Sequence, residues 1–235
     1  MDTTRRATFA SETAGISGMR NLTAEEVELK RSVRRRLIDI ALRRQRPGAG
    51  SPTLFLRRRT NLAQFPNPTV VLSNLRWAVI GGVATRLYMP ERATQDLDIL
   101  VHPEDGDEAR RRLAAAGFRR QGELAVGGSS WTGPDGSYLD VIEMGAPWLS
   151  QALAEAQHNR DAQGMPVLPL PYLVLLKFQA GRVQDLADVA RMLGQAGPDR
   201  LQAVRQLFFR HQPGDMDDLE SLIVLGQMEM DPPPA

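Results

Sequence analysis

Residues 96–101 read Asp96-Leu97-Asp98-Ile99-Leu100-Val101, an apolar run that opens with two aspartates around a leucine. This density of Leu, Ile and Val predicts a short β-strand. Residues two apart on a strand face the same side, so Asp96 and Asp98 point one way while Leu97 and Ile99 point into the core. The strand is therefore expected to carry a carboxylate pair on one face.

Two adjacent carboxylates repel and raise each other's pKa, and a divalent cation relieves that repulsion. Mg²⁺ prefers carboxylate oxygens together with phosphate oxygens and water. A third aspartate, Asp140, lies within Tyr138-Leu139-Asp140-Val141-Ile142, which predicts another strand. If the two strands are neighbours, the three aspartates form a metal site. The plainer alternative is that Asp96 caps a turn and Asp98 is a solvated strand position.

A glycine pair lies upstream of the aspartates. The β-prone run Arg76 to Ile80 ends at Gly81-Gly82, and a helix is expected from Val83 to Tyr88. Glycine lets the backbone approach a ligand closely, and helix N-termini favour phosphate. The interval between Gly82 and Asp96 accommodates a helix and a return strand, so a phosphate cradle and a metal pair are expected on adjacent strands.

The remaining pattern predicts an α+β chain in three parts. Residues 1–65 form a basic N-terminal helical extension, whose helix begins at the capping box Thr23/Glu26 and runs to about Arg46. Residues 66–146 form a core with a small mixed sheet flanked by helices. Residues 147–230 form a helical C-terminal part, with helices expected at 148–157, 171–180, 183–193, 199–209 and 215–227.

Composition narrows the class of protein. The 235 residues include no cysteine, which excludes disulfides, thiol catalysis and cysteine–zinc sites. No apolar run approaches the roughly 20 residues that span a membrane, so we expect a cytoplasmic protein without a membrane partner.

Positive charge is concentrated in the first part of the chain. Residues 1–60 hold fourteen Arg and Lys against six Asp and Glu, a balance of +8. Since the whole chain carries +1, the remaining residues carry −7. The basic part suits a polyanion such as RNA, or the acidic surface of the rest of the chain.

The chain resembles the DNA-polymerase-β-type nucleotidyltransferase superfamily in four elements that follow in order: Gly81-Gly82, 92–98 around Asp96 and Asp98, 139–141 around Asp140, and 177–189. The last contains Lys177, Arg182, Asp185 and Asp188. Within the superfamily the chain is similar to the small bacterial branch that contains the AbiEii-like toxins of type IV toxin–antitoxin systems. The resemblance covers residues 70–195. Most active members have Gly-Ser where this chain has Gly81-Gly82, so here Gly82 offers only its backbone N–H.

The resemblance implies a magnesium-dependent transfer of a nucleoside monophosphate from a nucleoside triphosphate such as ATP to a hydroxyl group. It implies two Mg²⁺ ions, with Mn²⁺ as the alternative, on the catalytic residues Asp96, Asp98 and Asp140. The nucleotide-binding residues it implies are Gly81, Gly82, Arg92, Lys177 and Asp185, with Arg86 a further candidate phosphate contact. Each of these candidates also has a plainer interpretation. Arg86 and Arg92 could be ordinary surface arginines, and Lys177 could extend to solvent. Arg182 and Asp185 could form a structural ion pair on one helix.

The sequence leaves three functions open. The first is transfer to an RNA, such as tRNA, or to a protein acceptor, by the toxin of a toxin–antitoxin system with an antitoxin protein as partner. The second is transfer to a small molecule of the antibiotic type. The third is a catalytically weak antitoxin or binding module on the same fold, which the absent serine suggests.

Overall fold

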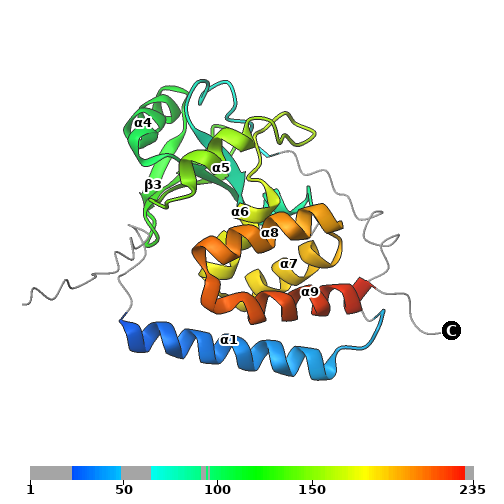
Figure 1. Cartoon of the computed structure of the whole chain (residues 1–235). Helices are drawn as coiled ribbons and strands as arrows, with labels where there is room; N and C mark the ends of the chain where they lie inside the picture. Colours follow the sequence, from blue (N-terminus) through cyan, green and yellow to red (C-terminus); the bar gives the residue numbers. More distant parts are fainter. Residues whose placement is uncertain (1–22, 49–64, 91–93, 95, 231–235) are drawn as a thin grey trace, which may run out of the picture.

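The computed structural model describes residues 23–48, 65–90, 94 and 96–230. Arg92, the possible element at 54–62 and both chain ends lie outside these residues. The described residues form one five-stranded mixed sheet with helices against it and a group of helices after it (Figure 1). This arrangement confirms the α+β class and the helical C-terminal part.

The sheet has the spatial order β1-β2-β5-β4-β3. Its strands are β1 (Trp77–Ile80), β2 (Asp96–Val101), β3 (Arg119–Glu123), β4 (Gly128–Thr132) and β5 (Tyr138–Glu143). β2 and β5 pair in parallel, and every other neighbouring pair is antiparallel. The strands predicted around Ile80, Asp98 and Asp140 are confirmed, and the last two are direct neighbours.

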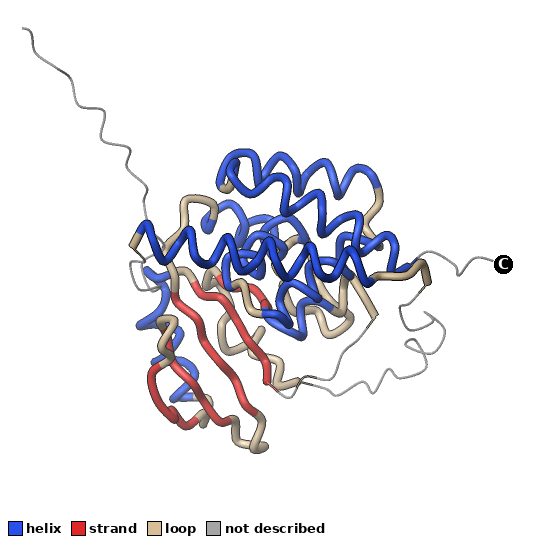
Figure 2. Tube along the Cα trace, turned by 90° about the horizontal axis from the view of Figure 1, so that it is seen from below, coloured by secondary structure: helices blue, strands red, loops and turns tan. Residues whose placement is uncertain are grey.

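Side-chain alternation on the two central strands separates the core from the acidic face. Leu97 and Ile99 on β2, and Leu139 and Val141 on β5, are fully buried. The intervening aspartates are less buried, as a period of two requires. Figure 2 shows the strands gathered on one side of the molecule and most of the helices on the other.

The strand β3, Arg119–Glu123, could not be predicted from the sequence pattern. Every residue of β3, Arg119–Glu123, is exposed, and its pairing with β4 is irregular between Arg120 and Gly122. A charged, irregular strand at the edge of a sheet discourages pairing with other chains. Because β3 buries none of its side chains, it has no apolar alternation from which a strand could be predicted.

The helices follow the expected order. α3 (Gly81–Thr85) follows β1, and η1 (Pro103–Asp105) and α4 (Gly106–Ala115) follow β2. The C-terminal part consists of α5 (Leu149–Ala156), α6 (Leu170–Ala180), α7 (Val183–Gly194), α8 (Pro198–His211), η2 (Pro213–Asp215) and α9 (Met216–Met230). Within the described ranges, no helix has the length and apolar character needed to cross a membrane.

Two glycines let α7 and α9 pack backbone to backbone. A Cβ added at Gly226 would lie 1.9 Å from the carbonyl oxygen of Ala190, and one at Gly194 would lie 2.3 Å from the backbone of Gly226. Neither position accepts a side chain without a shift of a helix. This contact fixes α7, which carries Asp185, against the end of the chain.

The N-terminal helix α1 (Ala24–Arg44) begins at the expected capping box, in which Thr23 and Glu26 bond reciprocally. It lies along α9, on the side of the molecule away from the sheet (Figure 1). Arg34 donates to Asp215 at 2.5 Å and to Asp218 at 2.8 Å, and its guanidinium lies 4.1 Å from the centre of the Phe178 ring. Part of the N-terminal positive charge therefore meets acidic residues of the same chain, which is one of the two partners expected from the charge distribution.

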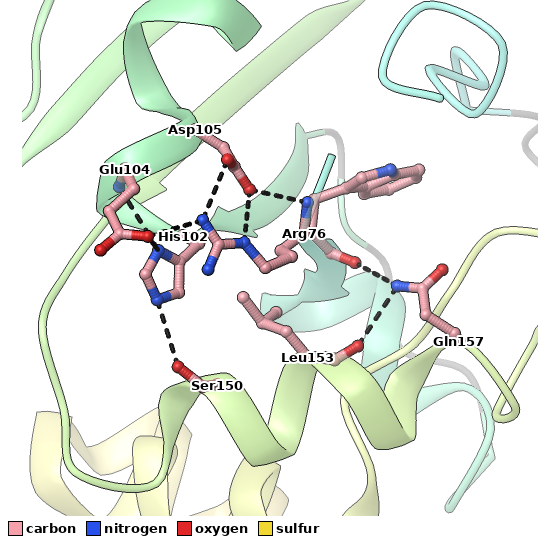
Figure 3. Close-up of polar contacts among 8 residues, drawn as sticks. Arg76, His102, Glu104, Asp105, Ser150, Leu153 and Gln157 are labelled. Atoms are coloured by element: carbon pink, nitrogen blue, oxygen red, sulfur yellow. Dashed lines mark hydrogen bonds and ion pairs between the residues drawn. The ribbon is translucent and has the colours of Figure 1, made fainter. Parts of the chain in front are cut away.

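A polar cluster closes the sheet end next to β1 (Figure 3). Arg76 donates to Asp105 at 2.8 Å and to Glu104 at 2.9 Å, and its hydrogen bonds lower the pKa of the Asp105 carboxyl. His102 Nε2 lies 3.2 Å from the Ser150 hydroxyl. The cluster joins the start of β1 to η1 and α5, so it holds the sheet edge in place.

Candidate functional site

Two of the candidate carboxylates lie opposite each other on the parallel central strands. Asp98 on β2 is the register partner of Asp140 on β5. Asp96 lies two residues before Asp98, on the same face but at the exposed start of β2. The backbone thus brings three acidic residues to one face of two adjacent strands.

The glycine pair lies directly beside Asp98. Ile80, the last residue of β1, pairs with Asp98, and Gly81 follows it with a φ of +65°. A Cβ at Gly81 would lie 1.9 Å from Oδ2 of Asp98. The backbone at Gly81 therefore approaches the carboxylate more closely than a residue with a side chain allows.

A cavity of about 430 Å³ lies between this face of the sheet and the helices α6 and α7. Its polar wall consists of Asp98, Asp140, Lys177, Gln179, Arg182 and Asp185. Its apolar wall consists of residues 124–126 in the β3–β4 turn together with Ile142, Met144 and Leu176. A concave site with an apolar wall and a few convergent polar groups suits a small organic ligand.

Lys177 is buried and paired, so it does not extend to solvent. Its ammonium lies 3.1 Å from Oδ1 of Asp185 and 2.8 Å from Oδ2 of Asp188. Arg182 Nε donates to the other oxygen of Asp185 at 2.6 Å, and Gln184 donates to Asp188 at 3.1 Å. The helix-surface pair between Arg182 and Asp185 is confirmed, and it is one part of a network that joins α6 to α7.

Asp98 has a perturbed acidity. Burial, followed by the negative charges of Asp140 and Asp96, raises the pKa of the Asp98 carboxyl from 3.8 to about 6. The positive charges of Lys177 and Arg182 act in the opposite direction but are outweighed. The repulsion that the sequence predicted for carboxylates on adjacent strands therefore adds to the effect of burial.

Comparisons with known proteins give remote structural similarities. No protein-family model matches the chain, and no curated protein sequence matches it. The solution structure of the antibiotic-resistance factor ANT(2'')-Ia is 18% identical to this chain, with a TM-score of 0.36; the match covers 66% of this chain and 83% of that chain. The crystal structure of ANT(2'')-Ia with adenylyl-2''-tobramycin is also 18% identical, with a TM-score of 0.37; the match covers 66% of this chain and 88% of that chain. Terminal uridylyl transferase 4 from Trypanosoma brucei with bound GTP is 12% identical over 76% of this chain and 70% of that chain, with a TM-score of 0.28.

The structure brings together most of the candidate residues. Gly81, Asp98, Asp140, Lys177 and Asp185 all line the cavity. Gly82 is buried behind Gly81, where its carbonyl accepts a 2.7 Å hydrogen bond from Thr85. Asp96 lies outside the cavity lining, and Arg92 lies outside the described residues.

Arg86 does not line the cavity. Its guanidinium lies 4.7 Å from the centre of the Phe65 ring, and the cavity is lined by other residues. The candidate role of Arg86 as a phosphate contact therefore has no support in this arrangement. Arg182 lines the cavity wall, although the sequence had indicated only an ion pair for it.

The sequence did not predict the apolar wall of the cavity. Residues 124–126 belong to the turn between β3 and β4, and Met144 follows β5. The position of residues 124–126 depends on the hairpin that β3 forms with β4. Because the sequence did not predict β3, it could not place this turn at the cavity.

The cavity is lined by carboxylates, whose oxygen atoms and negative charge suit a divalent cation. Three carboxylates and two cationic side chains line the cavity, and the charges of Asp140 and Asp96 add to burial in raising the pKa of Asp98, a repulsion that a cation relieves. In the described part of the chain, however, no three acidic, histidine or cysteine side chains converge closely enough to hold one ion. Of the three candidate aspartates, Asp98 and Asp140 line the cavity and could hold an ion together, whereas Asp96 lies outside the cavity lining.

Proposed function

We propose that this chain is a metal-dependent nucleotidyltransferase, which moves a nucleoside monophosphate from a nucleoside triphosphate to a hydroxyl group. The observation that carries the proposal is the position of Asp98. It lies opposite Asp140 on a parallel strand, against the backbone of Gly81, at the wall of a ligand-sized cavity.

Asp98 and Asp140, joined by Asp96, would hold Mg²⁺, with Mn²⁺ as the alternative. When bound, such ions neutralise phosphate charge and lower the pKa of an attacking hydroxyl. The side chains of the protein mainly position the reactants and stabilise charge.

The other cavity residues have separate roles in this proposal. Gly81, which lines the cavity and has no Cβ, would let phosphate oxygens approach the backbone beside Asp98. Lys177, held by Asp185 and Asp188, presents a fixed positive charge at the same wall. The apolar wall at 124–126 and Met144 covers the flat face of a base.

For the acceptor we propose an RNA or a protein, in keeping with a toxin of the branch that the sequence resembles. The exposed arginines Arg36, Arg43 and Arg44 in the second half of α1 support a polyanionic acceptor. The ion pairs that Arg31, Arg34 and Arg35 form with Asp215 and Asp218 remove part of that positive surface. This loss favours, as a second candidate, a small hydroxylated acceptor that enters the cavity itself.

The test is incubation of the protein with Mg²⁺, each of the four nucleoside triphosphates labelled at the α-phosphorus, and total bacterial RNA. The expected result is label in RNA or protein with the unchanged chain and none with Asp98→Asn. Asp107→Asn is the matched control, because Asp107 is an exposed acid on α4.

Label in neither polymer, but in a small product when hydroxylated antibiotics are added, would favour the second candidate. If calorimetry shows nucleotide binding but no transfer is detected, the result would favour a binding module over an enzyme. Failure of Mg²⁺ to raise the melting temperature of the unchanged chain more than that of Asp98→Asn would contradict the metal site.

A further inference from the structure

The helix α1 has two apolar faces, and the other described residues of the chain cover only one of them. Ile38, 4% exposed, faces the body of the molecule, beside the arginines that pair with Asp215 and Asp218. The outward face carries a stripe of exposed side chains, Leu29 at 65%, Val33 at 49%, Leu37 at 37% and Ile40 at 52%. We call these four residues the outer stripe.

The outer stripe has the geometry of a helix–helix seam. Its members recur at intervals of four, four and three residues, so they lie along one face of α1. α1 is 21 residues long, so it extends about 30 Å. In Figure 2, which is seen from below, α1 lies in front of the other described elements. A contiguous apolar stripe on an outer helix is typical of an interaction site.

Charges of opposite sign gather toward the two ends of α1, although exposed Lys30 and Asp39 interrupt this division. Exposed acids, Glu25, Glu26 and Glu28, lie at its start, and exposed arginines, Arg36, Arg43 and Arg44, lie toward its end. A helix with this polarity is complementary to an antiparallel copy of itself. We propose that the outer stripe binds a second copy of this chain, with the two α1 helices antiparallel about a two-fold axis.

The spacing of the stripe fits this symmetry. An axis that crosses α1 near Arg34 and Arg35 places Leu29 against the partner's Ile40 and Val33 against the partner's Leu37. The same axis places Glu25 beside the partner's Arg43 and the partner's Arg44. The interface is thus self-complementary, as a two-fold dimer requires.

This arrangement leaves both cavities accessible. α9 lies between α1 and the other C-terminal helices, and the sheet lies on the far side of them (Figure 1). The two cavities of a dimer would therefore face away from the contact. The proposal is independent of the chemistry assigned to the cavity.

The test is sedimentation velocity of the full chain over a dilution series. We expect a monomer–dimer equilibrium for the unchanged chain and a monomer for Val33→Asp at every concentration. Val224→Asp is the matched control, because Val224 is a valine of similar exposure, 46%, on α9. It should dimerise as the unchanged chain does.

A charge exchange tests the antiparallel direction without touching the stripe. Glu25→Arg places like charges together and should weaken the dimer at least severalfold, and the double change Glu25→Arg/Arg43→Glu should restore it. Restoration cannot come from a more stable helix, because the double change opposes the helix dipole at both ends. Two results would overturn the proposal. The first is an unchanged chain that stays monomeric, which would mean that another segment or a different protein covers the outer stripe. The second is a dimer that Val33→Asp leaves intact.

Discussion

Gly81 and Asp98 are the two residues whose positions depend most directly on each other. The positive φ of Gly81 turns the chain out of β1, and the missing Cβ leaves space for the Asp98 carboxylate. A residue with a side chain would be strained by the backbone conformation and would also collide with Oδ2 of Asp98. The two costs are separate, so they can be measured separately.

Gly81→Ala should destabilise the protein more than Gly136→Ala. Gly136 also has a positive φ, +82°, but a Cβ there would meet nothing within 4 Å. Both changes should lose about 1–2 kcal/mol of the free energy of unfolding through backbone strain. Gly81→Ala should lose a further ~1–3 kcal/mol through the collision with Asp98. Urea denaturation of both variants measures the difference, and equal losses would contradict the close approach.

The raised pKa of Asp98 predicts the pH dependence of stability without metal. Between the ordinary value of 3.8 and the folded value of about 6, the folded state binds more protons than the unfolded state. The contribution of Asp98 to the free energy of unfolding therefore falls as pH rises through this range. Asp98→Asn should remove that fall and stabilise the chain at pH 7 by up to about 3 kcal/mol.

Urea denaturation from pH 4 to pH 7 in a chelating buffer checks this prediction. Asp107→Asn, at a fully exposed side chain, is the control and should leave the pH profile unchanged. Parallel profiles for Asp98→Asn and the unchanged chain would show that neither burial nor the charges of Asp140 and Asp96 raise the pKa of Asp98.

At the scale of elements, the central strands and the C-terminal helices could be predicted because their side chains repeat with the period of the element. β2 and β5 alternate, α7 carries a regular apolar face, and α1 has a capping box. The expectation that β2 and β5 are neighbours, inferred only from the pattern of aspartates, is confirmed, and the structure adds that they pair in parallel.

Other features of the site could not be predicted because they depend on tertiary contacts. β3 buries no side chain, so it has no periodic pattern. Lys177 lies within an apolar helix, and the sequence could not decide between solvent and a partner. The packing of α6 against α7 decides it, because that packing brings Asp185 and Asp188 within 3.1 Å and 2.8 Å of the ammonium.

Lys177→Met should strongly destabilise the contact between α6 and α7. The change leaves Asp188, which is fully buried, and Asp185, which is 2% exposed, without the ammonium. Removal of one partner from a buried ion pair costs about 3–5 kcal/mol. Lys30→Met, at the exposed lysine of α1, should be close to neutral. Chemical denaturation compares the two, and restoration of stability in Lys177→Met/Asp188→Asn would assign the loss to the uncompensated charge.

At the scale of the whole molecule, the division of charge along the chain has a structural counterpart. The first 60 residues carry a balance of +8 and the rest −7. α1 joins these two parts through arginines that pair with Asp215 and Asp218, whose side chains are 3% and 5% exposed. Buried pairs are screened less by salt than surface pairs, so added salt should not release α1.

Arg34→Met should therefore weaken the packing of α1 on the rest of the molecule, whereas added salt should not. Arg34 bonds both buried acids and lies over Phe178, so its loss leaves Asp215 and Asp218 with weaker compensation and removes the contact to α6. We expect the backbone amides of α1 to exchange hydrogen at least tenfold faster, since a loss of about 1.4 kcal/mol of docking energy corresponds to that factor. Arg36→Met, at an exposed position of the same helix, should leave exchange unchanged. If high salt alone accelerates exchange in α1 as much as Arg34→Met does, the helix is held by surface electrostatics and not by the buried pairs.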